Sequence, residues 1–304
     1  MKIKFVIIGG GVAGLSAAIR LAELGQKPLI IESGNYPAHK ICGEFLSPEC
    51  MKQLNCWDIH PVFIKKTTLH TANHHLIFPF LVNAGSLSHL TLDPALVKYA
   101  LSLGCQFKTD SQVHLFEQKK DSKSPHLIHL SNSETIEAEN VILAAGKFHT
   151  YSAAPIKCYM GFKSHFDNSD LKIDHLEMFS FPNAYLGVSP VEDNKANVAC
   201  IAKISHMENI NPQTFIQNLI AKNPYLNALL PVKNNLFKEW MTASIPDFGF
   251  KQTPDWQDCY FIGDAAMTIP PASGNGLSLA IFGGCLAAEH AVEQKYLEFK
   301  KIWK

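Results

Sequence analysis

The chain has 304 residues, with 27 lysines and arginines against 27 acidic residues and a hydrophobic content of 47%. The balanced charge gives no electrostatic case for a nucleic-acid partner, and the length is typical of one composite domain or two. Eight cysteines without a C-x-x-C pair predict free thiols in a cytoplasmic protein, and a first strand at residue 2 leaves no room for a targeting segment. No apolar run predicts a membrane span, and no cluster at ligand spacing predicts a metal site.

The first 32 residues predict a βαβ unit that binds a dinucleotide. A strand over residues 2–8 leads into Gly9, Gly11 and Gly14, which form a G-x-G-x-x-G turn before a helix over residues 15–25. Gly9 permits the tight turn, Gly11 lets a pyrophosphate approach the backbone, and Gly14 lets the helix pack close to the strand. The sequence therefore predicts a phosphate site where this helix begins.

The helix start and the second strand complete the predicted site. Backbone N–H groups at Val12 and Ala13 lie at the positive end of the helix dipole, where phosphates bind. The second strand, residues 29–31, ends on Glu32, whose carboxylate can accept hydrogen bonds from both ribose hydroxyls of an adenosine.

A second motif, residues 40–48, follows directly and reads K-I-C-G-E-F-L-S-P. It predicts a loop that ends where Ser47 and Pro48 open a helix. The pattern resembles the geranylgeranyl reductase-like branch of FAD-dependent oxidoreductases, which are relatives of the para-hydroxybenzoate hydroxylase type. That resemblance implies a loop beside the isoalloxazine ring, with Lys40, Cys42 and Gly43 at the cofactor. It also implies that Cys42 and Glu44 lie near the chemistry. The alternative is that Cys42 is a small buried residue and Glu44 a solvated one.

The next hundred residues predict short strands around one helix. The helix is expected from Asp93 and Pro94 to Leu103, with proline at its first position. Strands are expected before it and after it, over residues 67–71, 74–80, 86–92, 106–108, 113–117, 127–130 and 135–136.

The core strand that starts at Val141 exits through Ala145 and Gly146. In the related FAD enzymes this glycine backs onto the cofactor. The hydroxylases carry an A-D-G motif here, and Ala145 replaces its aspartate. This departure weakens the expectation that the chain handles NADPH as those hydroxylases do.

Residues 156–241 predict an antiparallel sheet with helices over 212–230. Six large side chains on its strands either line a site for an apolar or aromatic substrate or form ordinary core. They are Tyr159, Phe162, Phe166, Met178, Phe179 and Tyr185.

A strand, a glycine turn and a helix near the end of the chain predict the second half of the site. The strand over residues 259–262 runs into Gly263 and Asp264, and P-P-A-S-G-N-G-L then opens a helix through about Glu289. The pattern resembles the second FAD motif of the hydroxylase and geranylgeranyl reductase families, which implies that Asp264 bonds a ribityl hydroxyl. The resemblance also implies cofactor contacts at Pro271, Gly274, Asn275, Gly276 and Leu277. The positive end of this helix dipole would stabilise negative charge on the reduced flavin.

Together these segments predict an α/β fold with a doubly wound, Rossmann-like FAD-binding domain and an inserted antiparallel β substrate domain. Residues 1–150 and 242–304 would form the discontinuous FAD-binding domain, and residues 151–241 the substrate-covering sheet with helices. The lysine-rich C-terminal helix, residues 293–304, is expected to dock on its own domain rather than on a membrane.

Three functions are consistent with this sequence. The first is an FAD-dependent monooxygenase that hydroxylates an apolar or aromatic small molecule. The second is a flavin-dependent reductase of carbon–carbon double bonds in an isoprenoid or other lipid-like substrate, with Cys42 or Glu44 facing the alkene. The third is an FAD-binding electron-transfer or biosynthetic partner without turnover of its own. No second G-x-G-x-x-G marks a nicotinamide domain, so electrons would come from transiently bound NAD(P)H or from a separate reductase.

Overall fold

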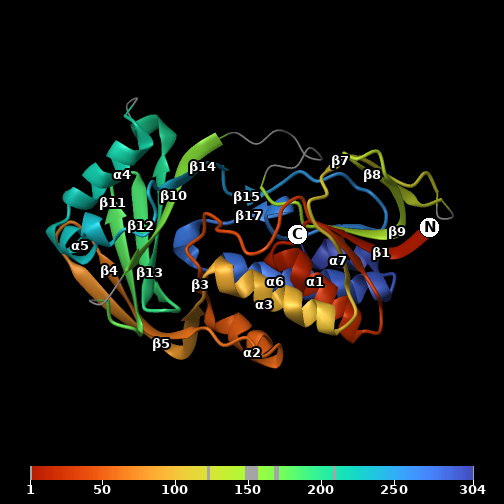
Figure 1. The fold of residues 1–304 in the computed structure, drawn as a ribbon, viewed down its shortest axis with the longest axis horizontal. Helices are drawn as coiled ribbons and strands as arrows, with labels where there is room; N and C mark the ends of the chain where they lie inside the picture. Colours follow the sequence, from red (N-terminus) through yellow and green to blue (C-terminus); the bar gives the residue numbers. More distant parts are fainter. Residues whose placement is uncertain (1, 122–123, 148–156, 168–170, 208–209, 304) are drawn as a thin grey trace.

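The computed structural model describes residues 2–121, 124–147, 157–167, 171–207 and 210–303, and it contains two large sheets (Figure 1). The first sheet has the strand order β6-β2-β1-β9-β8-β7, and β16 also pairs with β9. Its strands are β1 (Lys2–Ile8), β2 (Leu29–Ile31), β6 (Gln106–Lys108), β7 (Val113–Glu117), β8 (His126–Leu130), β9 (Thr135–Leu143) and β16 (Cys259–Phe261). β6, β2, β1, β9 and β16 run parallel, which is the Rossmann-like arrangement that the sequence predicted.

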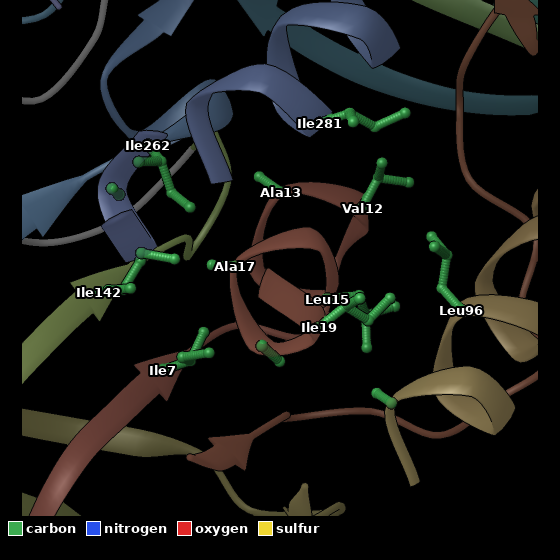
Figure 2. Packing of buried hydrophobic residues seen from close by; sticks show 14 of the residues in the cluster. Ile7, Val12, Ala13, Leu15, Ala17, Ile19, Leu96, Ile142, Ile262 and Ile281 are labelled. Carbon is green, nitrogen blue, oxygen red and sulfur yellow. The ribbon is translucent and has the colours of Figure 1, made fainter. Parts of the chain in front are cut away.

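Side chains of β1 alternate between two apolar layers, which is why this strand is apolar throughout. Phe5 and Ile7 pack with helices α1 (Val12–Glu23), α3 (His89–Ser102) and α6 (Gly276–Val292) on one face (Figure 2). Val6 and Ile8 pack on the other face, with side chains of β7 and β8. A Cβ on Gly284 would lie 2.5 Å from the carbonyl oxygen of Ala13, so α6 approaches α1 backbone to backbone.

The second sheet has the order β14-β10-β13-β12-β11-β4-β5-β3 and takes strands from two distant parts of the chain. β3 (Phe45–Leu46), β4 (Val62–His70) and β5 (His75–Ser86) come from the segment assigned above to the FAD-binding domain. The others are β10 (Lys157–Asp167), β11 (His175–Phe181), β12 (Ala184–Val191), β13 (Lys195–Lys203) and β14 (Met241–Pro246). The expected domain boundary at residue 150 lies outside the described residues.

Strands β10 to β14 pair antiparallel with one another, as expected, and the sheet becomes mixed only where β11 meets β4. β4 and β11 pair in parallel, with Lys66 opposite His175. Hairpins force antiparallel pairing only between consecutive strands, and six strands, β5 to β10, separate these two in the chain. Helices α4 (Pro212–Ala221) and α5 (Pro224–Leu229) cover the outer face of this sheet. The expected single helical stretch is divided at Asn223, whose side chain accepts a hydrogen bond from the backbone N–H of Leu226 at 2.9 Å.

Two further boundaries differ from the sequence prediction. The expected strand over residues 86–92 is wrong, because α3 begins at His89 and carries Pro94 inside it. The expected short strand at 135–136 and the core strand from Val141 are one continuous strand, β9. The remaining elements are α2 (Pro48–Cys56), β15 (Gly249–Phe250), β17 (Met267–Thr268) and α7 (Tyr296–Ile302).

Helix α7 docks on its own domain, as expected. Tyr296 and Phe299 are buried in the core that α1 and α6 share, and the Trp303 ring packs where a Cβ on Gly283 would lie 2.4 Å away. Within the described residues, every helix falls short of the length and apolarity that a bilayer crossing requires.

Candidate active site

The first glycine turn has the geometry that the sequence motif predicts. Gly9 has a φ of +102°, and a Cβ there would lie 2.4 Å from the carbonyl oxygen of Ala144. A Cβ on Gly14 would lie 1.9 Å from the carbonyl oxygen of Gly9, so helix α1 can approach the turn only at a glycine. At Gly11, in contrast, a Cβ would meet only the Lys40 Nζ, at 3.7 Å. The turn is therefore packed at Gly9 and Gly14 and open at Gly11, where a pyrophosphate would lie.

Glu32 stands at the end of β2 beside this turn. Its Oε2 accepts a hydrogen bond from the backbone N–H of Gly10 at 2.6 Å, and its Oε1 accepts one from Gly34 at 2.8 Å. Oε1 also accepts a hydrogen bond from the Ser33 hydroxyl at 3.3 Å, so Oε2 is the oxygen that keeps a lone pair for a ribose hydroxyl. The Tyr36 hydroxyl donates to the carbonyl oxygen of Gly10 at 2.5 Å, and burial raises the pKa of this hydroxyl, so it stays a donor.

The second glycine turn follows β16 and leads into α6. Gly263 and Gly274 have φ values of +57° and +71°, which only glycine adopts at little cost. Asp264 is half-exposed and lies 3.8 Å from the Lys147 Nζ. α6 begins at Gly276, its first helical bond runs from Leu279 N–H to the Asn275 carbonyl, and the N–H groups before it are free of intrahelical partners.

The loop with the K-x-C-G-E motif spans the distance between the two turns. Lys40 lies beside Gly11, and a Cβ on Gly274 would lie 3.0 Å from the Phe45 ring. Farther along, the Ser47 Oγ lies 2.5 Å from the Ser278 Oγ in the first turn of α6. The middle of the loop therefore lies between the two cofactor motifs. Gly43 is open on its Cβ side, with no described atom within 4 Å.

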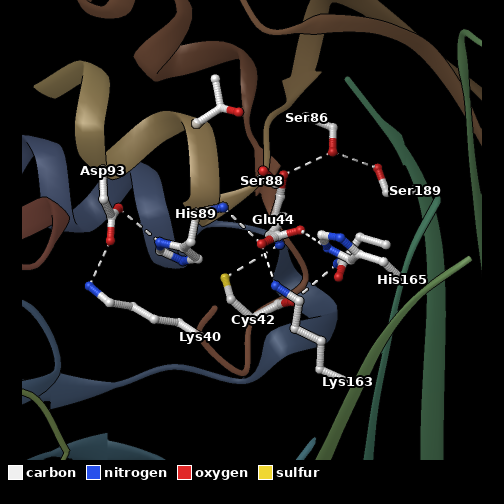
Figure 3. A network of polar contacts seen from close by, with 12 residues as sticks. Lys40, Cys42, Glu44, Ser86, Ser88, His89, Asp93, Lys163, His165 and Ser189 are labelled. Carbon is white, nitrogen blue, oxygen red and sulfur yellow. Dashed lines mark hydrogen bonds and ion pairs between the residues drawn. The ribbon is translucent and has the colours of Figure 1, made fainter. Parts of the chain in front are cut away.

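The Cys42 thiol lies beside the ring of His89, a residue that the sequence analysis did not single out (Figure 3). The His89 Nδ1 lies 2.9 Å from the Asp93 Oδ1, and the Asp93 Oδ2 lies 2.7 Å from the Lys40 Nζ. Burial alone would raise the pKa of the Cys42 thiol, but the neighbouring His89 outweighs it and the pKa is lower than usual. Burial opposes the His89 charge, yet Asp93 and Cys42 raise the His89 pKa to about 9.

Glu44 is fully buried, so the alternative of a solvated side chain is wrong. Its Oε1 accepts hydrogen bonds from the backbone N–H of His89 at 2.8 Å and from the buried Lys163 ammonium (Figure 3). Its Oε2 lies 2.8 Å from the His165 Nε2. Burial would raise the Glu44 pKa, but His165 and Lys163 together hold it below its usual value. Glu44 therefore bridges the loop to β10 of the second sheet.

The six large side chains proposed as a substrate lining are divided between two faces of the second sheet. Phe162, Phe166 and Phe179 are buried against α4 and α5, so for these the ordinary-core alternative is right. Met178 is half-buried on the opposite face and packs against a small buried cluster that Phe45, the loop residue beside Gly274, also contacts. Phe80 belongs to the same cluster. The last two, Tyr159 and Tyr185, are also half-buried.

Sequence reasoning missed four polar residues of this site: His89, Asp93, Lys163 and His165. His89 and Asp93 have the i, i+4 spacing of one helical face, but the predicted helix began at Asp93 and left His89 outside it. Lys163 and His165 are two residues apart on β10, a spacing that puts both on one face of the strand. These two spacings are the sequence signals that could have pointed to the four residues.

The described residues fit FAD. The open Cβ side of Gly11 leaves space for a pyrophosphate, Glu32 stands at the ribose position, and the start of α6 offers free N–H groups to a flavin. Ala145 and Gly146 follow β9, and Gly146 has a φ of +79° with an open Cβ side. No described cluster of His, Cys and acidic side chains could hold a metal ion.

Comparisons with known proteins agree with this geometry. A family model described as pyridine nucleotide-disulphide oxidoreductase matches residues 3–169. The digeranylgeranylglycerophospholipid reductase of Methanosarcina mazei is 24% identical over 325 residues, which cover 96% of this chain and 76% of that protein.

Two solved structures share the fold. A geranylgeranyl bacteriochlorophyll reductase-like protein from Thermoplasma acidophilum has a TM-score of 0.78 and 21% identity, over 100% of this chain and 83% of that one. A myxobacterial chondrochloren halogenase, one of the FAD-dependent halogenases, has a TM-score of 0.82 and 16% identity, over 99% and 79%. The chain therefore belongs to the pyridine nucleotide-disulphide oxidoreductase family, and it is an FAD-dependent oxidoreductase with a Rossmann-like fold, as its sequence predicted.

Proposed function

We propose that this chain reduces carbon–carbon double bonds in an apolar, isoprenoid-like lipid, and that Cys42 and the loop around it form the catalytic centre. The observation that carries the proposal is the half-buried Cys42 thiol, which lies on the loop between the two glycine turns and beside the His89 ring. Reduced FAD, when bound, supplies a hydride.

Adding hydrogen across a double bond takes a proton as well as a hydride, and the chain must supply the proton. The Cys42 Sγ can give it to the second alkene carbon, because its side chain lies at the midpoint of the loop that spans both motifs. Hydroxylation places no such demand on a protein acid. We therefore favour reduction over the monooxygenase that the sequence also predicts.

The surroundings of the loop suit an apolar substrate. Phe45, Phe80 and Met178 pack against one buried cluster on the face of the second sheet opposite α4 and α5, and Phe45 also lies beside Gly274. Such a wall can hold a hydrocarbon chain and exclude water from the reacting carbons. The relative from Methanosarcina mazei is named for the reduction of a geranylgeranyl lipid, which is a substrate of this chemical class.

We also propose a cytoplasmic location, because all eight cysteines are free thiols, as a reducing compartment keeps them. The electron donor would be transiently bound NAD(P)H or a separate reductase.

The test is an anaerobic reaction of purified FAD-loaded protein with NADH, NADPH or dithionite and a geranylgeranyl-containing lipid, followed by mass spectrometry. We expect two added hydrogens per reduced double bond and reoxidation of the flavin by the alkene in the absence of oxygen. Reduction only by dithionite would indicate a separate reductase. A product that gains one oxygen after air is admitted would replace this proposal with hydroxylation. If the alkene does not reoxidise the reduced flavin, and oxygen reoxidises it without forming a product from the substrate, the chain is the non-catalytic partner.

A further inference from the structure

We propose that His89 and Asp93 are positioning residues that hold a shared proton at Cys42 and return it to the thiol after each turnover. The inference rests on the proposed function for the acceptor of the proton, but the relay itself is a property of the three side chains. Cys42 comes from the loop, whereas His89 and Asp93 come from α3, so two separate elements assemble the relay (Figure 3).

The relay has a fixed direction. His89 and Asp93 are one helical turn apart on α3, and both are buried, with 5% and 1% of their surface exposed. The Asp93 Oδ1 accepts the His89 Nδ1–H at 2.9 Å, which leaves the Nε2 for the Cys42 thiol. Lys40 forms an ion pair with the second oxygen of Asp93 at 2.7 Å. Asp93 therefore fixes both the tautomer and the orientation of the ring.

The sulfur is surrounded by groups that tolerate its negative form. The backbone N–H of Glu44 donates to the Cys42 Sγ at 3.3 Å, and His89 stands on its other side. Glu44 would repel a thiolate, but its own charge is paired with Lys163 and His165.

Two other charged or titratable groups face this region. His39 packs edge-on against the His165 ring at 4.9 Å, and burial lowers its pKa. Lys40 adds a positive charge behind Asp93. The two neighbours of Cys42 that can carry a charge each have a partner of opposite charge: Asp93 for His89 and Lys163 for Glu44.

The proton balance closes without any change of oxidation state at sulfur. The N–H bond at His89 Nε2 breaks as an S–H bond forms on Cys42. The S–H bond then breaks as a C–H bond forms on the substrate, and the electron pair stays on Sγ. Water supplies the next proton to Nε2, and Asp93 stays ionised throughout as the acceptor at Nδ1.

The decisive experiment measures the alkylation of Cys42 by iodoacetamide in FAD-loaded protein between about pH 5.5 and 9.5, resolved by peptide mass spectrometry. The exposed Cys56 serves as an internal reference. We expect the Cys42 rate to reach its plateau at lower pH than the Cys56 rate. In His89→Gln, Cys42 alkylation near pH 7 should fall roughly tenfold or more relative to Cys56, because each unit of thiol pKa changes the thiolate fraction about tenfold. Asp93→Asn should give a smaller decrease.

The matched control is His60→Gln. His60 and Asp58 also form a histidine–carboxylate pair, at 2.9 Å, but both side chains are exposed. This variant should leave the Cys42 profile unchanged. A second measurement needs no change at His89: the ultraviolet difference spectrum between wild type and Cys42→Ser reports thiolate formation during a pH titration. It should show Cys42 ionising below the pH at which an ordinary thiol does.

The relay is overturned if Cys42 ionises like an ordinary thiol in wild type, or if folded His89→Gln and Asp93→Asn leave its profile unchanged. If the alkylation profiles of Cys42 are as expected but the protein does not reduce an alkene, only the proposed function is contradicted. If the protein reduces an alkene but His89→Gln leaves the alkylation profile of Cys42 unchanged, only the relay is contradicted.

Discussion

Glu44 is a carboxylate with no exposed surface, placed between the Lys163 ammonium and the His165 ring. Its backbone also has a φ of +54°, a conformation that L-residues rarely adopt. Both features carry a cost in free energy, so the contacts must be what holds this part of the loop in place. The alternative of a solvated Glu44 side chain is thus replaced by a buried ion pair with Lys163.

We predict that Glu44→Gln lowers the free energy of unfolding by about 3 kcal/mol, because it leaves the buried Lys163 charge without its partner. Equilibrium denaturation in urea measures the change. The double variant Glu44→Gln/Lys163→Met should recover part of the loss, since it removes the unpaired charge as well. Because the folded-state pKa of Glu44 is lowered, its contribution is present above the pKa of the unfolded chain and is lost as pH falls through the folded value. A difference from wild type that stays constant into strong acid would contradict this role.

His89 should give the opposite pH dependence. Its folded-state pKa is raised to about 9, so its contribution to stability is complete below the unfolded value near 6.5 and is lost as pH rises through about 9. Wild type should therefore lose its advantage over His89→Gln between about pH 7 and 10, as measured by urea denaturation at each pH. His60→Gln, at an exposed pair, should run parallel to wild type over the same range. Parallel curves for His89→Gln would show that His89 is not charged in the fold.

At the scale of elements, the first turn separates glycines required by packing from a glycine that leaves room for a ligand. A Cβ on Gly14 would lie 1.9 Å from the Gly9 carbonyl oxygen, so Gly14→Ala should push α1 away from β1 and lower the free energy of unfolding by about 1–3 kcal/mol. Gly11 has φ −77° and ψ −179°, which any residue adopts, and its Cβ side is open. Gly11→Ala should therefore keep wild-type stability in the apoprotein. Thermal unfolding of both FAD-free variants is the measurement, and equal losses would contradict the assignment.

The elements of the first sheet could be predicted because buried parallel strands are continuous apolar runs and glycine turns have fixed spacing. The start of α3 could not. Pro94 suggested a first helical position, but the cap is Ser88, whose carbonyl accepts the Leu92 N–H at 2.8 Å. Because the predicted helix began four residues too late, His89 lay outside it, and the pairing of His89 with Asp93 beside Cys42 was missed.

The two glycine turns could be predicted from sequence for the same local reasons, whereas the polar contacts of Glu44 could not. Glu44 and Lys163 are 119 residues apart and meet only when the loop lies against β10. That contact depends on which strands pair and in what register, and the parallel pairing of β4 with β11 follows from no local pattern. The local sequence motif thus predicts the loop, whereas the residues that contact Glu44 are known only once the two sheets are assembled.

The fold brings together two glycine motifs from opposite ends of the chain, and an experiment can test whether both are needed to bind one FAD. Asp264 is half-exposed and lies 3.8 Å from Lys147, so Asp264→Ala should leave the fold intact. We predict that Asp264→Ala and Gly11→Val each yield folded protein without FAD, measured by visible flavin absorbance per chain and by circular dichroism. Asp174→Ala is the matched control, because Asp174 is similarly exposed and lies 3.6 Å from Lys65 in an ion pair outside the two motifs. If either motif variant keeps one FAD per chain, the two turns do not form one site. If both lose it and the control does not, the cofactor joins the first strand of the chain to its last long helix.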